Sequence, residues 1–433
     1  MSAALWNGYP IVYSDTASYI ISGFHLETLI DRPITYGLFI RACSFNGWSL
    51  WPVVIAQSLL LAHVIGLSLK SIGIQRSLAR AAIIIPSALL TGLPFVCGQL
   101  ITDVFTPILL FTLYLLLLAK GLPSRTRTLM FALFLLAFAM HMSHVAITAM
   151  ILLVVIAARY CRKHRSFLSP TWSTVGIIVL LAVAGTLVMG TALAKSKNSF
   201  FAARMAEAGI LQRYLAEHCG EEQFKLCGRL GSIPHDANDF LWDEDTPLNV
   251  YANRQELEDE LGRIAHGSFT EPALAWMHVK AAASSIQVQF TRFAVGDGNG
   301  AFGKETVLNQ RISLFIPSEA EQFYSARQMG GTRFQEPLIA ANVFYSTVMV
   351  LSLTALTVLW VVKRKALATG TVSPLVGYLL LGMVLNVCVN AGLVMVADRF
   401  GTKTAWIVPF CALVLLSFAM PPLTTRMSAP LAQ

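Results

Sequence analysis

The sequence contains few charged residues. Only 13% of its 433 residues are Asp, Glu, Lys or Arg, whereas 55% are hydrophobic and the mean hydropathy is +0.62. A soluble globular chain carries roughly 25% charged residues. A chain with so little charge cannot cover a water-facing surface, so a lipid bilayer must be the solvent for much of it. This composition excludes an ordinary soluble fold and makes membrane lipid a partner.

The sequence also lacks the common catalytic motifs. It has no P-loop, Rossmann glycine pattern, nucleophile elbow or HExxH sequence. Cations outnumber acids by 32 to 24, giving a net charge of +8, but no basic stripe is interleaved with aromatic residues. Nucleic acid is therefore excluded as a partner. The segment 296–300 (Gly-Asp-Gly-Asn-Gly) is a flexible turn that resembles a fragment of a calcium loop but lacks the ligand spacing that should follow.

Cysteine is scarce, and the sequence context divides the seven residues into two kinds. Five lie within or beside apolar segments and are interpreted as packing residues: Cys43, Cys97, Cys161, Cys388 and Cys411. Cys219 and Cys227 lie in a polar stretch and are predicted to form a disulfide, which requires an oxidising compartment. A zinc site is the alternative, with His218 and His235 as the only nearby further ligands.

Long apolar runs recur along the chain. They predict an all-α integral membrane protein with about nine transmembrane helices. The runs are 50–69, 78–97, 103–120, 127–140, 143–159, 172–193, 338–362, 374–396 and 404–420. The fourth run is short and is expected to pair with the fifth as a tight hairpin.

The cations between these runs predict the orientation. If the helices alternate in direction, a single side of the membrane receives Lys70, Arg76, Arg80, Lys120, Arg125, Arg127, Arg159, Arg162, Lys163, Arg165, Lys363, Arg364, Lys365 and Arg426. By the positive-inside rule that side is the cytoplasm. The cysteine pair then falls on the opposite side, where a disulfide can form. Together these features predict a multi-pass protein of the cell inner membrane, with its large loop in the periplasm.

Four regions follow from this topology. Residues 1–49 form an outer loop that is acidic and aromatic and includes membrane-surface segments. Residues 50–193 hold six transmembrane helices, residues 194–337 form a mainly helical soluble domain, and residues 338–433 hold three helices and a cytoplasmic tail. Residues 1–49 contain no spanning segment. Either they are translocated unaided, or the natural chain has a further helix before them.

Acids surrounded by aromatic residues mark the N-terminal loop. A first group contains Tyr13, Asp15 and Tyr19, and a second consists of Asp31, Arg32, Pro33 and Tyr36. An ordinary exposed tail is the alternative interpretation, although a tail rarely needs so many tyrosines. The sequence favours a site at the outer membrane surface.

Ionisable residues also occur at predicted outer helix ends. Asp103 is either a helix N-cap or a functional carboxylate. His141 and His144 are spaced i, i+3, so they share one face of a helical turn. This pair could bind a metal, transfer a proton or hold a phosphate as imidazolium, or it is simply a polar turn.

A basic residue stands before the last apolar run. Arg399 follows Asp398 on the predicted outer side, against the bias that places cations in the cytoplasm. Its guanidinium could bind a phosphate through two parallel hydrogen bonds. The alternative is a surface arginine that reaches lipid headgroups.

The chain resembles the GT-C superfamily of polytopic glycosyltransferases, which take a sugar from a polyprenyl-phosphate carrier outside the membrane. Members include protein mannosyltransferases and the aminoarabinose transferase of lipid A. The matching features are Asp15 with Tyr13 and Tyr19, Asp31-Arg32-Pro33 with Tyr36, Thr102-Asp103, and Arg399. The family's first helix should precede the acidic loop, and this sequence has none there. Many relatives also carry their soluble part at the C-terminus rather than in a loop.

The resemblance implies transfer of a sugar to a glycan, lipid or protein acceptor. We expect Asp15, with Asp103 second, to be the base, and Arg399, with Arg32 and a histidine, to bind the carrier phosphate. A divalent metal, Mg or Mn, is left open. The competing hypotheses are a transporter or flippase for a lipid-linked or anionic solute, and a non-catalytic envelope-assembly protein. A transporter should place its charges near mid-membrane.

Overall fold

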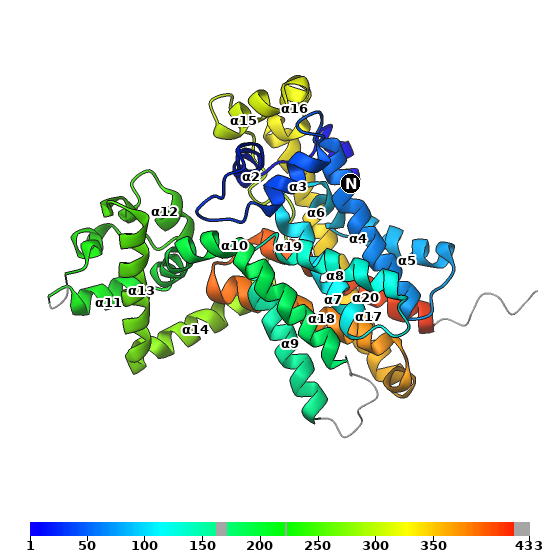
Figure 1. The fold of residues 1–433 in the computed structure, drawn as a ribbon. Coiled ribbons are helices and arrows are strands. Elements are labelled where there is room, and N and C mark those ends of the chain that lie inside the picture. The colour runs from blue at the N-terminus through cyan, green and yellow to red at the C-terminus, as the bar shows by residue number, and fades with distance from the viewer. Residues whose placement is uncertain (162–170, 221–222, 420–433) are drawn as a thin grey trace, which may run out of the picture.

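The protein is helical throughout the residues that the structure describes, which are 1–161, 171–220 and 223–419 of a computed structural model. The only β pairing in these residues is an isolated bridge between Ile11 and Gln99. Figure 1 shows a bundle of long helices, with a smaller lobe to one side. The predicted all-α class is confirmed at this level.

Helices occupy all nine predicted apolar runs. They are α4 (Trp51–Ser71), α5 (Ser77–Leu89), α7 (Phe105–Leu117), α8 (Ser124–Phe138), α9 (Ser143–Cys161), α10 (Trp172–Glu207), α17 (Thr332–Thr369), α18 (Val372–Leu393), and the pair α19 (Asp398–Ala405) and α20 (Ile407–Ala419). Among the described residues, six of these are long and apolar enough to cross a membrane: α4, α9, α10, α17, α18 and the α19–α20 pair. The count of nine stays a prediction.

Local features of the sequence explain why some helices are shorter than the apolar runs predict. The run 78–97 is divided into α5 and α6 (Leu93–Gly98), because Thr91 and Gly92 make a turn before Pro94. Helix α7 has 13 residues and begins only after Asp103, which lies in the 3₁₀ turn η1 (Thr102–Val104). At 1.5 Å per residue such a helix is about 20 Å long, less than the roughly 30 Å hydrocarbon core.

Two of the predicted cytoplasmic connections and the end of α7 lie together at one end of the bundle. Thr371 Oγ1 donates to the carbonyl of Ile72 at 3.3 Å, which joins the connection after α4 to the one after α17. The ring of Tyr114 lies 5.9 Å from that of Tyr378 and its hydroxyl is 3.4 Å from Ser71 Oγ. We call this the cationic end. The predicted cations Arg162, Lys163, Arg165 and Arg426 lie outside the described residues.

The N-terminal residues close the opposite end, which we call the site end. They form α1 (Ser2–Asn7), α2 (Ser14–His25) and α3 (Thr35–Cys43). Tyr9, Ile11 and Val12 are fully buried, and the Ile11 backbone exchanges hydrogen bonds with the backbones of Gly98 and Leu100 at 2.9 and 2.8 Å. The interpretation of this segment as an exposed tail is therefore wrong.

The predicted domain 194–337 has two parts that pack differently. The lobe comprises the end of α10 with α11 (Ile210–His218), α12 (Ala237–Trp242) and α13 (Arg254–Thr270), together with η2 (Lys225–Ser232) and η3 (Pro247–Val250). It has its own apolar core around Leu211, Phe240 and Leu261. The predicted disulfide Cys219–Cys227 is present and joins α11 to η2.

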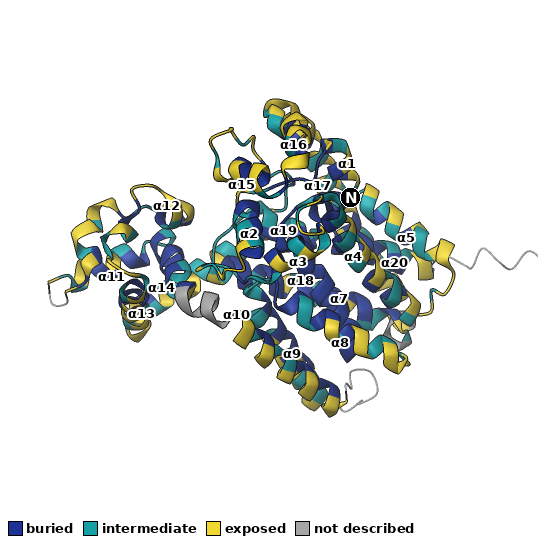
Figure 2. Ribbon diagram, turned by 45° about the horizontal axis from the view of Figure 1, so that its top comes forward, coloured by how far each residue is buried: buried dark blue, intermediate teal, exposed yellow. Residues whose placement is uncertain are grey.

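The second part of this region packs against the bundle. It contains α15 (Val307–Phe315), η4 (Pro317–Glu319), α16 (Ala320–Ser325) and η5 (Arg327–Gly330). The Phe315 ring packs at a tilt on the Phe24 ring of α2, with the centroids 4.8 Å apart. Helix α14 (Pro272–Gln289) connects the lobe to the bundle, and Figure 2 shows buried residues in both parts.

Candidate functional site

Asp15 is held by two arginines from distant parts of the chain. It lies in the first turn of α2, where a carboxylate is favoured by the helix dipole. Its Oδ1 is 3.1 Å from Nη1 of Arg32, and its Oδ2 is 3.1 Å from Nη1 of Arg399. The predicted base and the predicted phosphate ligand are therefore direct neighbours.

Aromatic rings and a second carboxylate surround these arginines. Arg32, in the α2–α3 loop, lies 5.2 Å from the ring centroid of Tyr19, and its Nε donates to Asp31 Oδ2 at 2.9 Å. Arg399 lies 4.8 Å from the ring centroid of Tyr13. Cation–π contacts of this kind hold a guanidinium in place without neutralising it. We call Asp15, Asp31, Arg32 and Arg399 the outer cluster.

Burial and the charges of the outer cluster determine which of its side chains are protonated. Burial alone would raise the pKa of Asp15, but Arg32 and Arg399 outweigh it and hold the pKa below its ordinary value of 3.8. Burial raises the pKa of Tyr19 to about 12 and also raises that of Tyr13. At neutral pH Asp15 is ionised and both phenols are protonated. Asp15 is a weak base while both arginines hold it.

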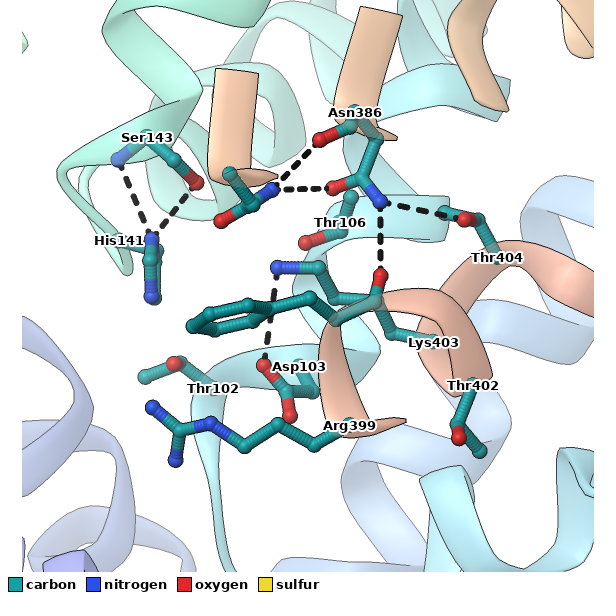
Figure 3. A network of polar contacts seen from close by, with 12 residues as sticks. Thr102, Asp103, Thr106, His141, Ser143, Asn386, Arg399, Thr402, Lys403 and Thr404 are labelled. Atoms are coloured by element: carbon teal, nitrogen blue, oxygen red, sulfur yellow. Dashed lines mark hydrogen bonds and ion pairs between the residues drawn. The ribbon is translucent and has the colours of Figure 1, made fainter. Parts of the chain in front are cut away.

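A second ion pair lies behind the outer cluster. The Nζ of Lys403, one turn after Arg399 on α19, is 3.8 Å from Oδ1 of Asp103 (Figure 3). The Lys403 side chain is 0% exposed and its ammonium makes no hydrogen bond, while the Asp103 side chain is 5% exposed. We call Asp103 and Lys403 the inner pair. Lys403 received no role from the sequence, although its i, i+4 spacing from Arg399 was a usable signal.

In the part of the chain that the structure describes, neither predicted histidine pairs with the outer cluster. His144 is fully buried, with Nε2 3.0 Å from Thr106 Oγ1 and Nδ1 2.7 Å from the carbonyl oxygen of Ala137. His141 Nδ1 accepts from the backbone N–H of Ser143 at 3.1 Å, as Figure 3 shows. Burial lowers the pKa of His141 well below its usual value, so it is neutral at pH 7. This argues against an imidazolium that holds phosphate.

The glycine-rich segment 296–300, predicted to be a flexible turn, completes the site. Asp297 Oδ2 accepts the Arg399 backbone N–H at 3.2 Å, and Asn299 Nδ2 donates to the carbonyl of Val12 at 2.9 Å. Gly298 has φ +67°, and a Cβ there would lie 1.8 Å from the Tyr13 ring, so only glycine fits. The turn joins α19 to the N-terminal segment.

A small pocket lies between this turn and the inner pair. Its polar lining residues are Gln99, Asp103, Asp297, Asn299, Arg399, Thr402 and Lys403. Its cavity volume is about 10 Å³, roughly the space of one water molecule. Asp15 and His144 are not part of its wall. Of the predicted site residues, the pocket brings together only Arg399 and Asp103.

The donor set does not fit a divalent metal. Both carboxylate oxygens of Asp15 face a guanidinium, and an ammonium lies 3.8 Å from Oδ1 of Asp103. Within the described ranges no group of three or more His, Cys, Asp or Glu side chains is placed to hold a metal ion. We therefore assign no step to Mg or Mn.

Comparison with known proteins gives no relative for this chain. No family model, no curated protein and no solved structure matches it. The outer cluster and the inner pair are therefore the features of this chain that indicate a function.

Proposed function

We propose that the protein is a membrane glycosyltransferase that transfers a sugar from a polyprenyl-phosphate donor to a periplasmic, lipid or polysaccharide acceptor. The observation that carries this proposal is the carboxylate of Asp15 held between Arg32 and Arg399 at one end of a membrane bundle. A base and a phosphate ligand must lie within about one substrate of each other, because both act on groups bonded to one anomeric carbon.

The proposal includes a topology. Nine transmembrane helices alternate, the cationic end faces the cytoplasm, and the site end and the soluble lobe face the periplasm. The shared position of the connections at Ile72 and Thr371 supports this arrangement. The Cys219–Cys227 disulfide supports an oxidising compartment for the lobe. The periplasm contains no nucleotide sugars, so an enzyme that works there needs a sugar donor carried by a lipid.

Exchange of partners by Arg399 would activate the base. In the structure Arg399 is bonded to Asp15, which keeps the carboxylate weakly basic. A donor phosphate competes for the same guanidinium, and Arg binds phosphate well. When Arg399 turns to the phosphate, Asp15 loses one of its two cations and its basicity rises. Donor binding would thus prepare the base for the acceptor.

The proposed transfer is a displacement at the anomeric carbon of the donor sugar. The acceptor oxygen forms a bond to the anomeric carbon, and its proton passes to Asp15. The bond between that carbon and the donor phosphate oxygen breaks, and the electron pair leaves with the phosphate. Arg399 stabilises the charge that develops on the phosphate, while Arg32 keeps the Asp15 carboxylate in position.

A transfer assay tests the proposal. Purified protein in proteoliposomes is given a radiolabelled polyprenyl-phosphate sugar and an extract of envelope acceptors. Asp15→Asn should lower turnover roughly 10²-fold or more, and Arg399→Lys should be milder than Arg399→Ala. Arg292→Gln is the matched control, because this half-exposed arginine pairs with Asp398 at the same end but does not touch Asp15. Full transfer by Asp15→Asn would refute the assignment.

One observation favours a second function, transport of a lipid-linked or anionic solute. The inner pair and His144 place ionisable side chains inside the helix bundle, where such residues often mark a pathway. A transporter should move solute across a proteoliposome membrane without chemical change. Movement that requires Lys403 but not Asp15, with no transferred sugar, would favour this function over the transferase.

A further inference from the structure

Helix α14 exposes an apolar stripe on the side that faces away from the lobe. Trp276, Val279 and Phe290 are 57%, 54% and 44% exposed, and Ala283 between them is also exposed. Leu274 is fully buried in the lobe core. Ala283 follows Leu274 by nine residues, about two and a half helical turns, so it points in the opposite direction. The lobe and the stripe therefore occupy opposite faces of α14.

The position of α14 along the bundle is fixed by two contacts. It crosses α18 at Gly392, where a Cβ would lie 3.6 Å from Ile286 and 4.0 Å from Ala282. The Gln289 amide donates to the Ala397 carbonyl at 2.9 Å and accepts the Ala397 N–H at 3.0 Å. Gly392 is next to the last residue of α18, and Ala397 immediately precedes α19. The helix thus lies level with the site-end termini of two apolar spans.

Polar residues flank the stripe on one side only. Lys280, Ser284 and Gln287 are exposed beside it, and the Lys280 ammonium lies 5.6 Å from the ring centroid of Trp276. Lys280 and Ser284 also line an open groove between α14 and α10. Tryptophan and lysine side by side are typical of helices at a membrane interface, where the ring and the stem lie among lipid and the charge reaches phosphate.

We propose that α14 is an interfacial helix that lies on the bilayer surface at the site end, with the stripe of Trp276, Val279, Ala283 and Phe290 inserted among lipid headgroups. Phospholipid is the occupant because α14 packs at the site-end termini of α18 and of the α19–α20 pair, which are long and apolar enough to cross a bilayer. The lobe then stands in water directly above the surface. This inference requires α18 and the α19–α20 pair to span a membrane, and it does not depend on the transfer reaction.

Depth measurements on single labels test it. The variants Ala283→Cys and Asp259→Cys of the full chain are each labelled with a nitroxide and placed in phosphatidylcholine–phosphatidylglycerol nanodiscs. The unsubstituted protein, treated in the same way, gives the background signal from native thiols. Both positions are exposed, and Asp259 lies on α13 of the lobe. The label at 283 should lie roughly 5–10 Å below the phosphates. It should collide more often with oxygen than with a water-soluble nickel chelate. The label at 259 should show the opposite preference.

Two other occupants give different results. If α14 forms an interface with a second copy, dipolar coupling between two labels at 283 should broaden their nitroxide spectra. Mixing labelled with unlabelled protein should then remove the broadening. If the stripe faces water or awaits a soluble partner, the labels at 283 and 259 should have the same nickel accessibility. Either result would overturn the proposal. Val279→Glu should raise the nickel accessibility of the 283 label if the stripe lies in lipid.

Discussion

The outer cluster and the inner pair are ion pairs of opposite design. In the outer cluster Asp15 and Arg399 are each 22% exposed at the side chain, and both carboxylate oxygens of Asp15 have a guanidinium 3.1 Å away. In the inner pair Lys403 and Asp103 are 0% and 5% exposed, and they stand 3.8 Å apart with the ammonium lacking a hydrogen bond. The accessible pairs are fully matched, and the buried pair is poorly matched.

This difference in exposure and matching suits the two groups to different roles. A matched, partly exposed cluster costs little to form and can exchange one partner for a substrate group, because water and other cations compensate. A buried pair has lost its hydration, so each charge depends on the few charges close to it, which for Asp103 are Lys403 and Arg399. The outer cluster therefore suits substrate exchange. The inner pair suits a fixed electrostatic role beneath it.

Breaking the inner pair should have the largest effect on stability. Lys403→Met leaves the Asp103 carboxylate buried without its cation, which should cost about 3–5 kcal/mol of unfolding free energy. Unfolding in bicelles, followed by steric trapping, measures this change. Lys363→Met is the matched control, because Lys363 is an exposed lysine at the cationic end, and it should change stability by less than about 0.5 kcal/mol.

The paired variant sharpens the result. Asp103→Asn combined with Lys403→Met removes both charges and should recover part of the loss seen with Lys403→Met alone. A double variant as unstable as the sum of the single variants would show that the 3.8 Å separation carries no energetic coupling.

Removing one side of the outer cluster should cost less. Arg399→Ala leaves Asp15 paired with Arg32, so we expect a loss of about 1–2 kcal/mol in unfolding free energy. Arg399→Lys should lose less, because the charge remains and only the fork geometry is gone. The same bicelle measurement applies, with Arg292→Ala as the control. A larger loss for Arg399→Ala than for Lys403→Met would reverse the comparison between the two groups.

Acid should act on the outer cluster through Asp15. The pKa of Asp15 is lowered in the folded protein, so its ionised form contributes stability above the ordinary value of 3.8. That contribution is lost as the pH falls through the folded pKa. The difference in Tm between the wild type and Asp15→Asn should therefore narrow from pH 5 to pH 3. A constant difference over this range would show that Asp15 is not held ionised by the arginines.

The helices and the shared side of Asp15 and Arg399 could be predicted from the sequence. Apolar runs mark the helices, and the cations between them place both residues at one end of the bundle. The number of spans could not be predicted as easily, because Gly92 and Asp103 shorten apolar runs through local turns. Hydropathy averaged over a window does not register such breaks.

Long-range contacts explain what the sequence could not predict. Asp297 reaches α19 across about a hundred residues of chain, and no local pattern distinguishes its glycine-rich turn from a mobile one. Lys403 could be assigned to a face with Arg399 by helical spacing, but its burial depends on where α7 begins. The role of α14 required knowledge of where it crosses α18.

The smallest effect should come from Asp31. This acid contacts Arg32 only on the side away from Asp15, and Arg32 keeps Asp15, the Asp15 carbonyl and the Tyr19 ring as partners. Asp31→Asn should change the unfolding free energy by less than about 1 kcal/mol. Combining it with Asp15→Asn in a double-mutant cycle measures how far the two acids share Arg32. Removing both carboxylates leaves this partly buried guanidinium without an anion, so the double variant should lose more than the two single losses together. Strict additivity would mean that Asp31 belongs to the surface and that the outer cluster consists of Asp15 and its two arginines.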